Sequence, residues 1–488
     1  MKMNRIIIFL VAVSGIMVSC NKWLEQSPIS SITSGSFWKT SDDAAGVLNG
    51  MYLEARAFCS YNLMTWGETR SDMYAGGMAG NYWNVYYNNT ISPSDPGPNW
   101  YNIYRTINYA NLLLKYVPDL SYAVEAEKNS VLAQAYTMRA WCYFIITRTW
   151  GDAIVITDPM EEYSPDKVYR PRLPKTEVFA LIKNDLDEAL KLFPDNNLPA
   201  GRYYWSKTGA NVLKGDVYLW TAKTMNGGDD DLQTALDALN QIQPTTTLYL
   251  LDDYLNVFSF TNKGNNEVIM VSRFDAPPEA SDNAYAYLYI NTNPGFTPEE
   301  LAFISPIGAG NTGVNIAQIR QEVRDQFTLD DQRRNSFYEI FNADGGFVTS
   351  VNIKGRGYND GGTRRFADDI VIYRYADVLL LRAEAKSALG QDPSEEMNEI
   401  RKRAYGDKSD DYLFVNGKKA DNDATILKER LLEFVTEGKR WWDLIRFDKV
   451  YDLVPAYIGQ QKDARKYVFP VGLDIRSREP LVEENPGW

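Results

Sequence analysis

Residues 127–150 read EKNSVLAQAYTMRAWCYFIITRTW, and this stretch decides the class of the fold. Its apolar and small side chains recur every three or four residues, at Ala133, Tyr136, Ala140, Tyr143 and Thr147. That spacing lines one face of an α-helix, and the alanines on this face let a neighbouring helix approach closely. The stretch therefore predicts a long helix that packs against other helices.

Further stretches repeat this pattern and also predict helices. They are residues 102–117, 176–193, 206–225, 375–389, 394–405, 424–438 and 441–450. Because neighbouring helices follow one another through short loops, we expect antiparallel pairs, as in tetratricopeptide-like scaffolds. This scaffold is predicted over about residues 100–260 and 373–450. No clean 34-residue repeat can be aligned, so the prediction depends on helix pairing and alanine spacing.

Two insertions of different composition interrupt the predicted helices, at about residues 60–100 and 260–370. Both are rich in Gly, Asn, Pro and Tyr, and the second contains short β-like runs at 267–271 and 347–351. Loops this long are uncommon unless they have a function, because ordering them costs about 1–2 kcal/mol per residue in backbone entropy. The predicted fold is therefore mostly α, as a single domain over residues 20–488 with long irregular and β-hairpin insertions.

The composition excludes several classes of protein. Among 488 residues there is no histidine, so a Ser-His-Asp triad, a Cys-His pair and a His-ligated metal are all excluded. The formal charge of −13 disfavours nucleic acid as a partner, since such binding depends on Lys and Arg neutralising phosphates. Cys59 and Cys142 lie in helix-like apolar patterns, where a buried free thiol is more common than a disulfide.

The N-terminus has the pattern of a lipoprotein signal peptide over residues 1–19. Lys2 and Arg5 precede an uncharged run over 6–18, which at about 20 Å of helix is too short to span a membrane. Residues 17–20, MVSC, resemble a bacterial lipobox, which implies cleavage before Cys20 and acylation of this residue. Several acyl chains would anchor the protein durably to a membrane. The alternative is a plain secretory peptide with an incidental cysteine.

Five segments spread over the chain carry a resemblance to a known family. They are CNKWLE at 20–25, RAWCYF at 139–144 with WGD at 150–152, YRYADVLLLRAEA at 373–385, EFVTEGKRWWDLIR at 433–446 and NPGW at 485–488. With these segments the chain resembles the SusD/RagB family, surface lipoproteins of Bacteroidetes that capture nutrients for a SusC-like TonB-dependent transporter. Lys439 departs from the family pattern, which often has histidine there.

The resemblance implies a SusD-like fold, an outer-membrane location at the cell surface, and binding without catalysis, cofactor or metal. The segment 433–446 also has a physical interpretation. Its charged residues lie three or four apart, which predicts charge pairs within one helix: Glu433, Glu437, Arg440, Asp443 and Arg446. We therefore expect these residues to support the fold and not to bind a ligand.

Candidate ligand-binding residues gather in the first insertion. A saccharide presents hydroxyl groups to polar side chains and a flat C–H face to aromatic rings. Trp66, Asp72, Trp83 and Tyr86 provide both kinds of group, and the run 68–72, ETRSD, supplies charge among them. The alternative is that these aromatic residues anchor a long loop to the scaffold.

Three further candidates are Asp43, Tyr287 and Arg365. Asp43 stands where a helix is predicted to begin, so it either caps that helix or faces the same loops. Tyr287 alternates with Tyr285 and Tyr289, which on a strand would put all three rings on one face, for core packing or for stacking. Arg365 follows a Gly-rich turn and could clamp hydroxyl groups or a carboxylate, or form an ion pair with Asp368 or Asp369.

The sequence favours an oligosaccharide-binding lipoprotein among several hypotheses. A member of the same family that binds oligopeptides is the first alternative. A glycoside hydrolase needs only two carboxylates and no histidine, but no spacing in the sequence marks such a pair. A helical scaffold with only protein partners is the last alternative.

Overall fold

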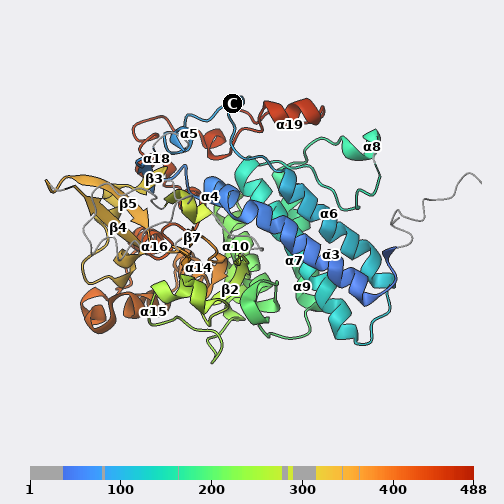
Figure 1. Cartoon of the computed structure of the whole chain (residues 1–488), viewed down its shortest axis with the longest axis horizontal. Helices are drawn as coiled ribbons and strands as arrows, with labels where there is room; N and C mark the ends of the chain where they lie inside the picture. Colours follow the sequence, from blue (N-terminus) through green and yellow to red (C-terminus); the bar gives the residue numbers. More distant parts are fainter. Residues whose placement is uncertain are drawn as a thin grey trace, which may run out of the picture.

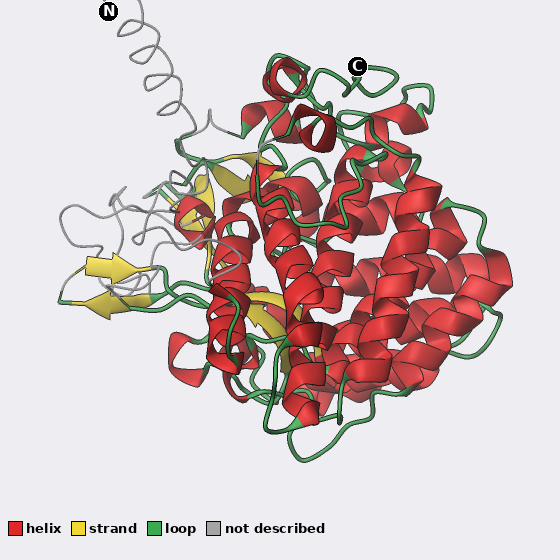
Figure 2. Ribbon diagram, turned by 90° about the vertical axis from the view of Figure 1, so that its right-hand side faces the viewer, coloured by secondary structure: helices red, strands yellow, loops and turns green. Residues whose placement is uncertain are grey.

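The computed structural model describes residues 37–79, 83–162, 164–276, 284–288, 315–342, 344–361 and 363–488. The predicted signal peptide and Cys20 lie outside the described residues. Helices make up most of the described chain, and the strands are short: some lie at the edge of the helical body and others among the helices (Figure 2). The expected mostly α fold is confirmed.

The first group of helices packs in the order of the chain, which confirms the predicted pairs. α6 contacts α3 and α7, α7 contacts α9, and α10 contacts α9 and α11 (Figure 1). The bounds are α3 Ser41–Cys59, α6 Tyr101–Tyr116, α7 Glu125–Trp150, α9 Lys175–Leu192, α10 Lys207–Thr224 and α11 Gly228–Asn240. Each predicted helix of this group lies within two residues of the observed one.

A second group of helices is centred on α14 (Tyr375–Ala388), which packs against α11, α15 (Ser394–Tyr405) and α16 (Lys419–Glu433). The predicted helices 424–438 and 441–450 are wrong at their ends. α16 stops at residue 433 and α17 (Arg440–Arg446) begins only at residue 440, because Thr436 and Gly438 adopt positive φ angles of 63° and 74° between them. α17 ends at residue 446, just before Asp448, which has a positive φ of 57°.

Within the described residues, the strands form four separate two-stranded antiparallel ladders: β1 with β3, β2 with β8, β4 with β5, and β6 with β7. Their bounds are β1 Tyr74–Gly76, β2 Val268–Ser272, β3 Ala317–Ile319, β4 Phe337–Phe341, β5 Phe347–Asn352, β6 Tyr358–Asp360, β7 Thr363–Arg365 and β8 Ile370–Arg374. The β-like runs predicted at 267–271 and 347–351 are thus confirmed as β2 and β5. The β1–β3 ladder joins the two predicted insertions.

Short helices complete the described fold. They are α4 Tyr61–Gly67, α5 Asn84–Tyr87, α8 Pro165–Val168, α13 Gln321–Arg324, α18 Val450–Leu453 and α19 Leu473–Arg478. A 3₁₀-helix, η6, covers Ala284–Leu288, so the strand considered for the alternating tyrosines does not form there. Tyr289 lies outside the described residues.

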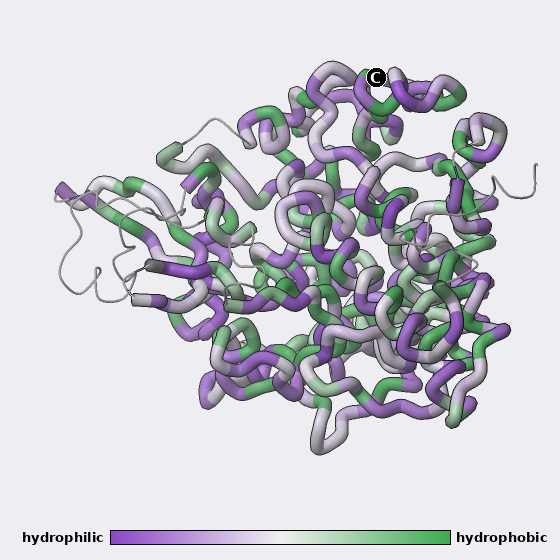
Figure 3. The backbone as a smooth tube through the Cα atoms, turned by 45° about the vertical axis from the view of Figure 1, so that its right-hand side comes forward, coloured by the Kyte–Doolittle hydropathy of each residue, from purple (hydrophilic) through white to green (hydrophobic). Residues whose placement is uncertain are grey.

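The largest cluster of the core reaches from Ala44 in α3 to Val482 near the C-terminus, and a second, smaller cluster lies around Tyr254, Val268 and Val371. Cys59 and Cys142 are free and buried, as predicted. Hydrophobic and hydrophilic stretches alternate along the chain (Figure 3), and none of the described helices is long and apolar enough to cross a membrane.

Candidate functional site

The two tryptophans predicted to contact a ligand are buried. Trp66 and Trp83 have no exposed surface. The indole of Trp66 donates to the carbonyl of Pro98 at 3.1 Å and packs edge-on against Trp150, and the indole of Trp83 donates to the Tyr61 hydroxyl at 2.9 Å. The expectation that these two rings face a sugar is therefore wrong, and the alternative, that they anchor the insertion to the core, describes them.

The charged run 68–72 is buried as well and contacts the C-terminal part of the chain. Asp72 forms a bidentate pair with Arg440, with both N···O distances at 2.8 Å. Glu68 accepts backbone N–H groups of Thr436 at 3.1 Å and Gly438 at 2.8 Å. Because both carboxylate oxygens of Asp72 pair with Arg440, Asp72 supports the fold, and the prediction that it binds a ligand is wrong.

Arg70 completes this connection between the two ends of the chain. Its guanidinium donates to the carbonyls of Lys466 at 2.7 Å and Val468 at 3.1 Å, and it lies 4.4 Å from the ring centroid of Trp441. The two hydrogen bonds join residues 396 and 398 positions apart.

Asp43 and Arg365 have local structural roles. Asp43 accepts the side-chain hydroxyl of Thr40 at 2.9 Å and the backbone N–H of Thr40 at 2.8 Å in a capping box at the start of α3, and these hydrogen bonds lower its pKa. Arg365, on β7, lies 3.6 Å from the carboxylate of Asp360 on the paired strand β6. The alternatives of capping and ion pairing thus describe them, although the partner of Arg365 is neither of the aspartates expected from the sequence.

Tyr287 is the aromatic residue among the predicted ligand contacts that reaches the surface, with 38% of the residue exposed. Its ring centroid lies 5.2 Å from that of Tyr61 and 6.4 Å from that of Trp83. We call Tyr61, Trp83 and Tyr287 the aromatic corner. Tyr86 is buried within hydrogen-bonding reach of the Tyr61 hydroxyl and so supports this corner from below without being exposed itself.

The geometry of the aromatic corner is fixed by its buried members. Trp83 stacks at an angle against Tyr74, which is fully buried, and its N–H holds the Tyr61 hydroxyl. Burial raises the pKa of Tyr61, so this hydroxyl stays protonated at neutral pH. The arrangement presents one partly exposed ring on a rigid aromatic base.

Arg320 lies near this region and was missed in the sequence. Its backbone N–H donates to the carbonyl of Met73, so it directly follows the β1–β3 ladder, and its charge acts on Asp72 and Tyr87. The guanidinium Nε is buried and makes no hydrogen bond within the described part of the chain. No motif marks this arginine, because only the pairing of β1 with β3 brings residue 320 to residue 73.

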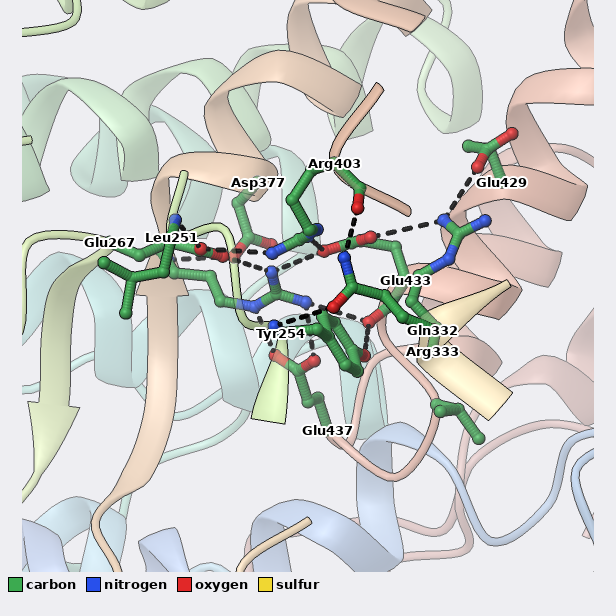
Figure 4. A network of polar contacts seen from close by, with 12 residues as sticks. Leu251, Tyr254, Glu267, Gln332, Arg333, Asp377, Arg403, Glu429, Glu433 and Glu437 are labelled. Atoms are coloured by element: carbon green, nitrogen blue, oxygen red, sulfur yellow. Dashed lines mark hydrogen bonds and ion pairs between the residues drawn. The ribbon is translucent and has the colours of Figure 1, made fainter. Parts of the chain in front are cut away.

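A network of buried ion pairs lies where β8 meets α14, α15 and α16 (Figure 4). Arg374, the last residue of β8, donates to Glu433 at 2.6 Å and to Glu267 at 2.7 Å. It also forms a bidentate pair with Glu437, at 2.8 and 3.0 Å. Arg374 and these three glutamates have no exposed side-chain surface.

This network corrects the charge pairs predicted within the segment 433–446. Among the predicted residues, Asp443 and Arg446 do pair three positions apart, at 2.9 Å. Glu433 and Glu437 instead pair with arginines and a lysine from other elements. Burial opposes ionisation of Glu437, but Arg374 and Lys354 outweigh it and lower its pKa to about 2. The expectation that the segment supports the fold agrees with these contacts.

Metal ligands are not gathered in the described residues. Across these ranges, no group of three or more Cys, Asp or Glu side chains is placed to hold a metal ion.

Two family profiles match the chain. One, described as "SusD family", matches residues 330–488, and the other, described as "Starch-binding associating with outer membrane", matches residues 22–219. The structure of NanU from B. fragilis is 31% identical, covers 95% of this chain and 99% of NanU, and superimposes with a TM-score of 0.82. The chain belongs to the SusD family.

Other SusD relatives agree over nearly the full length. SusD-like protein P38 from Formosa agariphila is 28% identical over 99% of this chain and 98% of its own. A SusD superfamily structure from Bacteroides vulgatus is 28% identical, covers 92% of this chain and 100% of its own, and has a TM-score of 0.79. The resemblance inferred from the five sequence segments is thus confirmed, together with the SusD-like fold.

Proposed function

We propose that this protein binds oligosaccharides at the outer membrane and delivers them to a SusC-like TonB-dependent transporter, without altering them. Membership of the SusD family supports this function, as does the description of the profile over residues 22–219. The observation that carries the proposal is Tyr287, a partly exposed ring held on the buried aromatic base of Tyr61 and Trp83.

The proposed contact is between the C–H face of a sugar ring and the exposed face of Tyr287. Such a contact removes apolar area from water, and the tyrosine hydroxyl at the rim can exchange hydrogen bonds with sugar hydroxyl groups. Because Tyr61 and Trp83 fix the ring, little side-chain entropy is lost when the sugar binds. Arg320 supplies hydrogen-bond donors in the same part of the fold.

The test is calorimetric titration of the protein with a panel of oligosaccharides and oligopeptides. Tyr287→Ala should weaken binding of the preferred oligosaccharide about 2- to 12-fold, the factor that corresponds to about 0.5–1.5 kcal/mol for an aromatic contact. Tyr249→Ala is the matched control, because Tyr249 is 40% exposed but lies outside the aromatic corner. Binding of peptides alone would contradict the proposal and favour an oligopeptide-binding member of the family.

We also propose that Cys20 carries the lipid that holds the protein at the cell surface. A Cys20→Ser variant should lose incorporation of radiolabelled palmitate and leave the outer-membrane fraction, because the acyl chains on Cys20 are the proposed anchor. Labelling that persists in this variant would refute the assignment.

The oligosaccharide recovered after incubation with the protein should be chemically intact, and cleavage would favour a glycoside hydrolase.

A further inference from the structure

A pocket of about 240 Å³ opens between α3, β2 and the residues that precede α10. It contains no residue of the aromatic corner. Its floor is apolar and buried, and consists of Cys59, Met138, Trp141, Met270 and Ile372. Its mouth combines aromatic, polar and charged side chains, which are Asn49, Tyr52, Leu53, Arg56, Tyr203, Tyr204, Arg273 and Asp275. An enclosed apolar floor with a few polar groups at the rim is the usual form of a small-molecule site.

Three tyrosines form one wall of this pocket. The ring centroids of Tyr203 and Tyr204 are 4.7 Å apart, and those of Tyr52 and Tyr204 are 4.9 Å apart. The Tyr52 hydroxyl donates to Gln134 at 2.9 Å and accepts the backbone N–H of Trp205 at 2.8 Å, so this ring is fixed from behind. The wall is therefore rigid, and it offers ring surface to a flat apolar face.

Asn49 adds a hydrogen-bonding group to the same wall. Its side-chain oxygen accepts the Tyr204 hydroxyl at 2.6 Å. This bond orients the amide and leaves its two N–H groups to donate to a ligand.

The charges at the mouth do not balance. Arg273 pairs with Asp275 at 2.6 Å, and its guanidinium lies 5.2 Å from the ring centroid of Tyr203. Arg56 donates to the backbone carbonyl of Arg273 at 3.4 Å and has no ion pair within the described residues. One positive charge is thus left over at this pocket in a chain whose formal charge is −13.

We infer that this pocket binds an anionic sugar unit, with the carboxylate or sulfate group on Arg56 and the ring against Tyr203 and Tyr204. An arginine presents a planar fork that matches both anions with two parallel hydrogen bonds. A neutral sugar would use the tyrosine wall but would leave the charge of Arg56 uncompensated. This inference depends on the proposed function and specifies its substrate class, an oligosaccharide that carries acidic units.

The test is titration with three oligosaccharides of equal length: one ending in a uronic acid, one with a sulfated terminal sugar, and one neutral. The wild-type protein should bind an acidic one about 10- to 100-fold more tightly than the neutral one, the ratio that a charge-assisted contact supplies. Which acidic ligand binds more tightly identifies the anion. Raising the salt concentration should reduce the preference.

The variants Arg56→Met and Arg56→Lys test the role of the guanidinium. Arg56→Met should abolish the preference for the acidic ligand and retain the affinity for the neutral one, whereas Arg56→Lys should keep part of the preference. Arg465→Met is the matched control, because the Arg465 side chain is 63% exposed and lies in a different part of the chain. An unchanged thermal midpoint of Arg56→Met shows that it is folded.

The outcomes separate this inference from the proposed function. Equal affinity of the wild-type protein for the three ligands, or a preference that survives in Arg56→Met, would overturn the anionic pocket alone. If none of a wide panel of saccharides bound, the proposed function would fall together with it. Loss of neutral binding in Tyr287→Ala with the acidic preference intact would show that the two sites act separately.

Discussion

Replacing Arg374 by methionine should strongly destabilise the protein, because this arginine is the centre of the buried network. The change keeps an unbranched side chain but removes five hydrogen bonds, two of them to Glu437 and one to the backbone carbonyl of Glu433. Glu433 retains Arg333 and Arg403, while Glu437 retains Lys354. Every glutamate thus keeps a partner, but one negative charge becomes unmatched.

The magnitude follows from the balance of charges in the network. Its six cations are Arg333, Lys354, Arg374, Arg401, Arg403 and Lys439, and its six anions are Glu267, Asp331, Asp377, Glu429, Glu433 and Glu437. Breaking a buried pair by removing one partner costs about 3–5 kcal/mol, chiefly because a charge is left buried without compensation. We expect the free energy of unfolding to fall by about this amount in Arg374→Met.

The assay is urea unfolding of the protein without its signal peptide, followed by tryptophan fluorescence and circular dichroism. The double variant Arg374→Met/Glu437→Gln removes one charge of each sign, so its loss should be smaller than the sum of the two single losses by at least about 1 kcal/mol. Arg465→Met, which removes an exposed arginine, should leave the unfolding free energy unchanged. Additive losses in the double variant would refute the charge-balance explanation.

Two further predictions concern stability. Although burial opposes it, Arg446 lowers the pKa of Glu384 from 4.5 to about 2. The stabilisation from this carboxylate is therefore complete above about pH 4.5 and is lost as the pH falls towards 2. In Glu384→Gln, the slope of unfolding free energy against pH in that window should decrease, and an unchanged slope would contradict the pairing. A methyl group on Gly67 would lie 1.9 Å from the carbonyl oxygen of Gly438, so Gly67→Ala should lower the free energy of unfolding by about 1–3 kcal/mol. Gly46→Ala, in open space within α3, should raise it by about 1 kcal/mol. Both values are measured by urea unfolding, and equal effects would show that the close approach of Gly67 to Gly438 is unimportant.

The helices could be predicted from the sequence because their signal is local. Apolar spacing placed α6, α7, α9, α10 and α14 within two residues of their observed bounds. The break between α16 and α17 could not be predicted in this way, since the pattern of charges and apolar residues continues across it. Positive φ angles at Thr436 and Gly438, which turn backbone N–H groups towards Glu68, interrupt the helix instead.

The candidate site was less predictable because the exposure of each aromatic ring depends on how the two insertions pack in the fold. Composition places aromatic residues in the region but does not separate the exposed ring of Tyr287 from the buried rings of Trp66 and Trp83. The partner of Asp72 is 368 positions away, so no local pattern could reveal that its charge is already used. The pocket beside Arg56 was missed for the same reason, since α3 and β2 meet only in the fold.

The contacts of the run 68–72 have a consequence for how the polypeptide could be divided. A cut between residues 219 and 330, where neither family profile matches, would place Asp72 on one fragment and Arg440 on the other. Either fragment alone would bury or expose groups whose partners are missing, so neither should be stable by itself. Mixed together, the fragments carry complementary surfaces from the two ends of the chain, and their reassociation would make this fold a scaffold for fragment complementation.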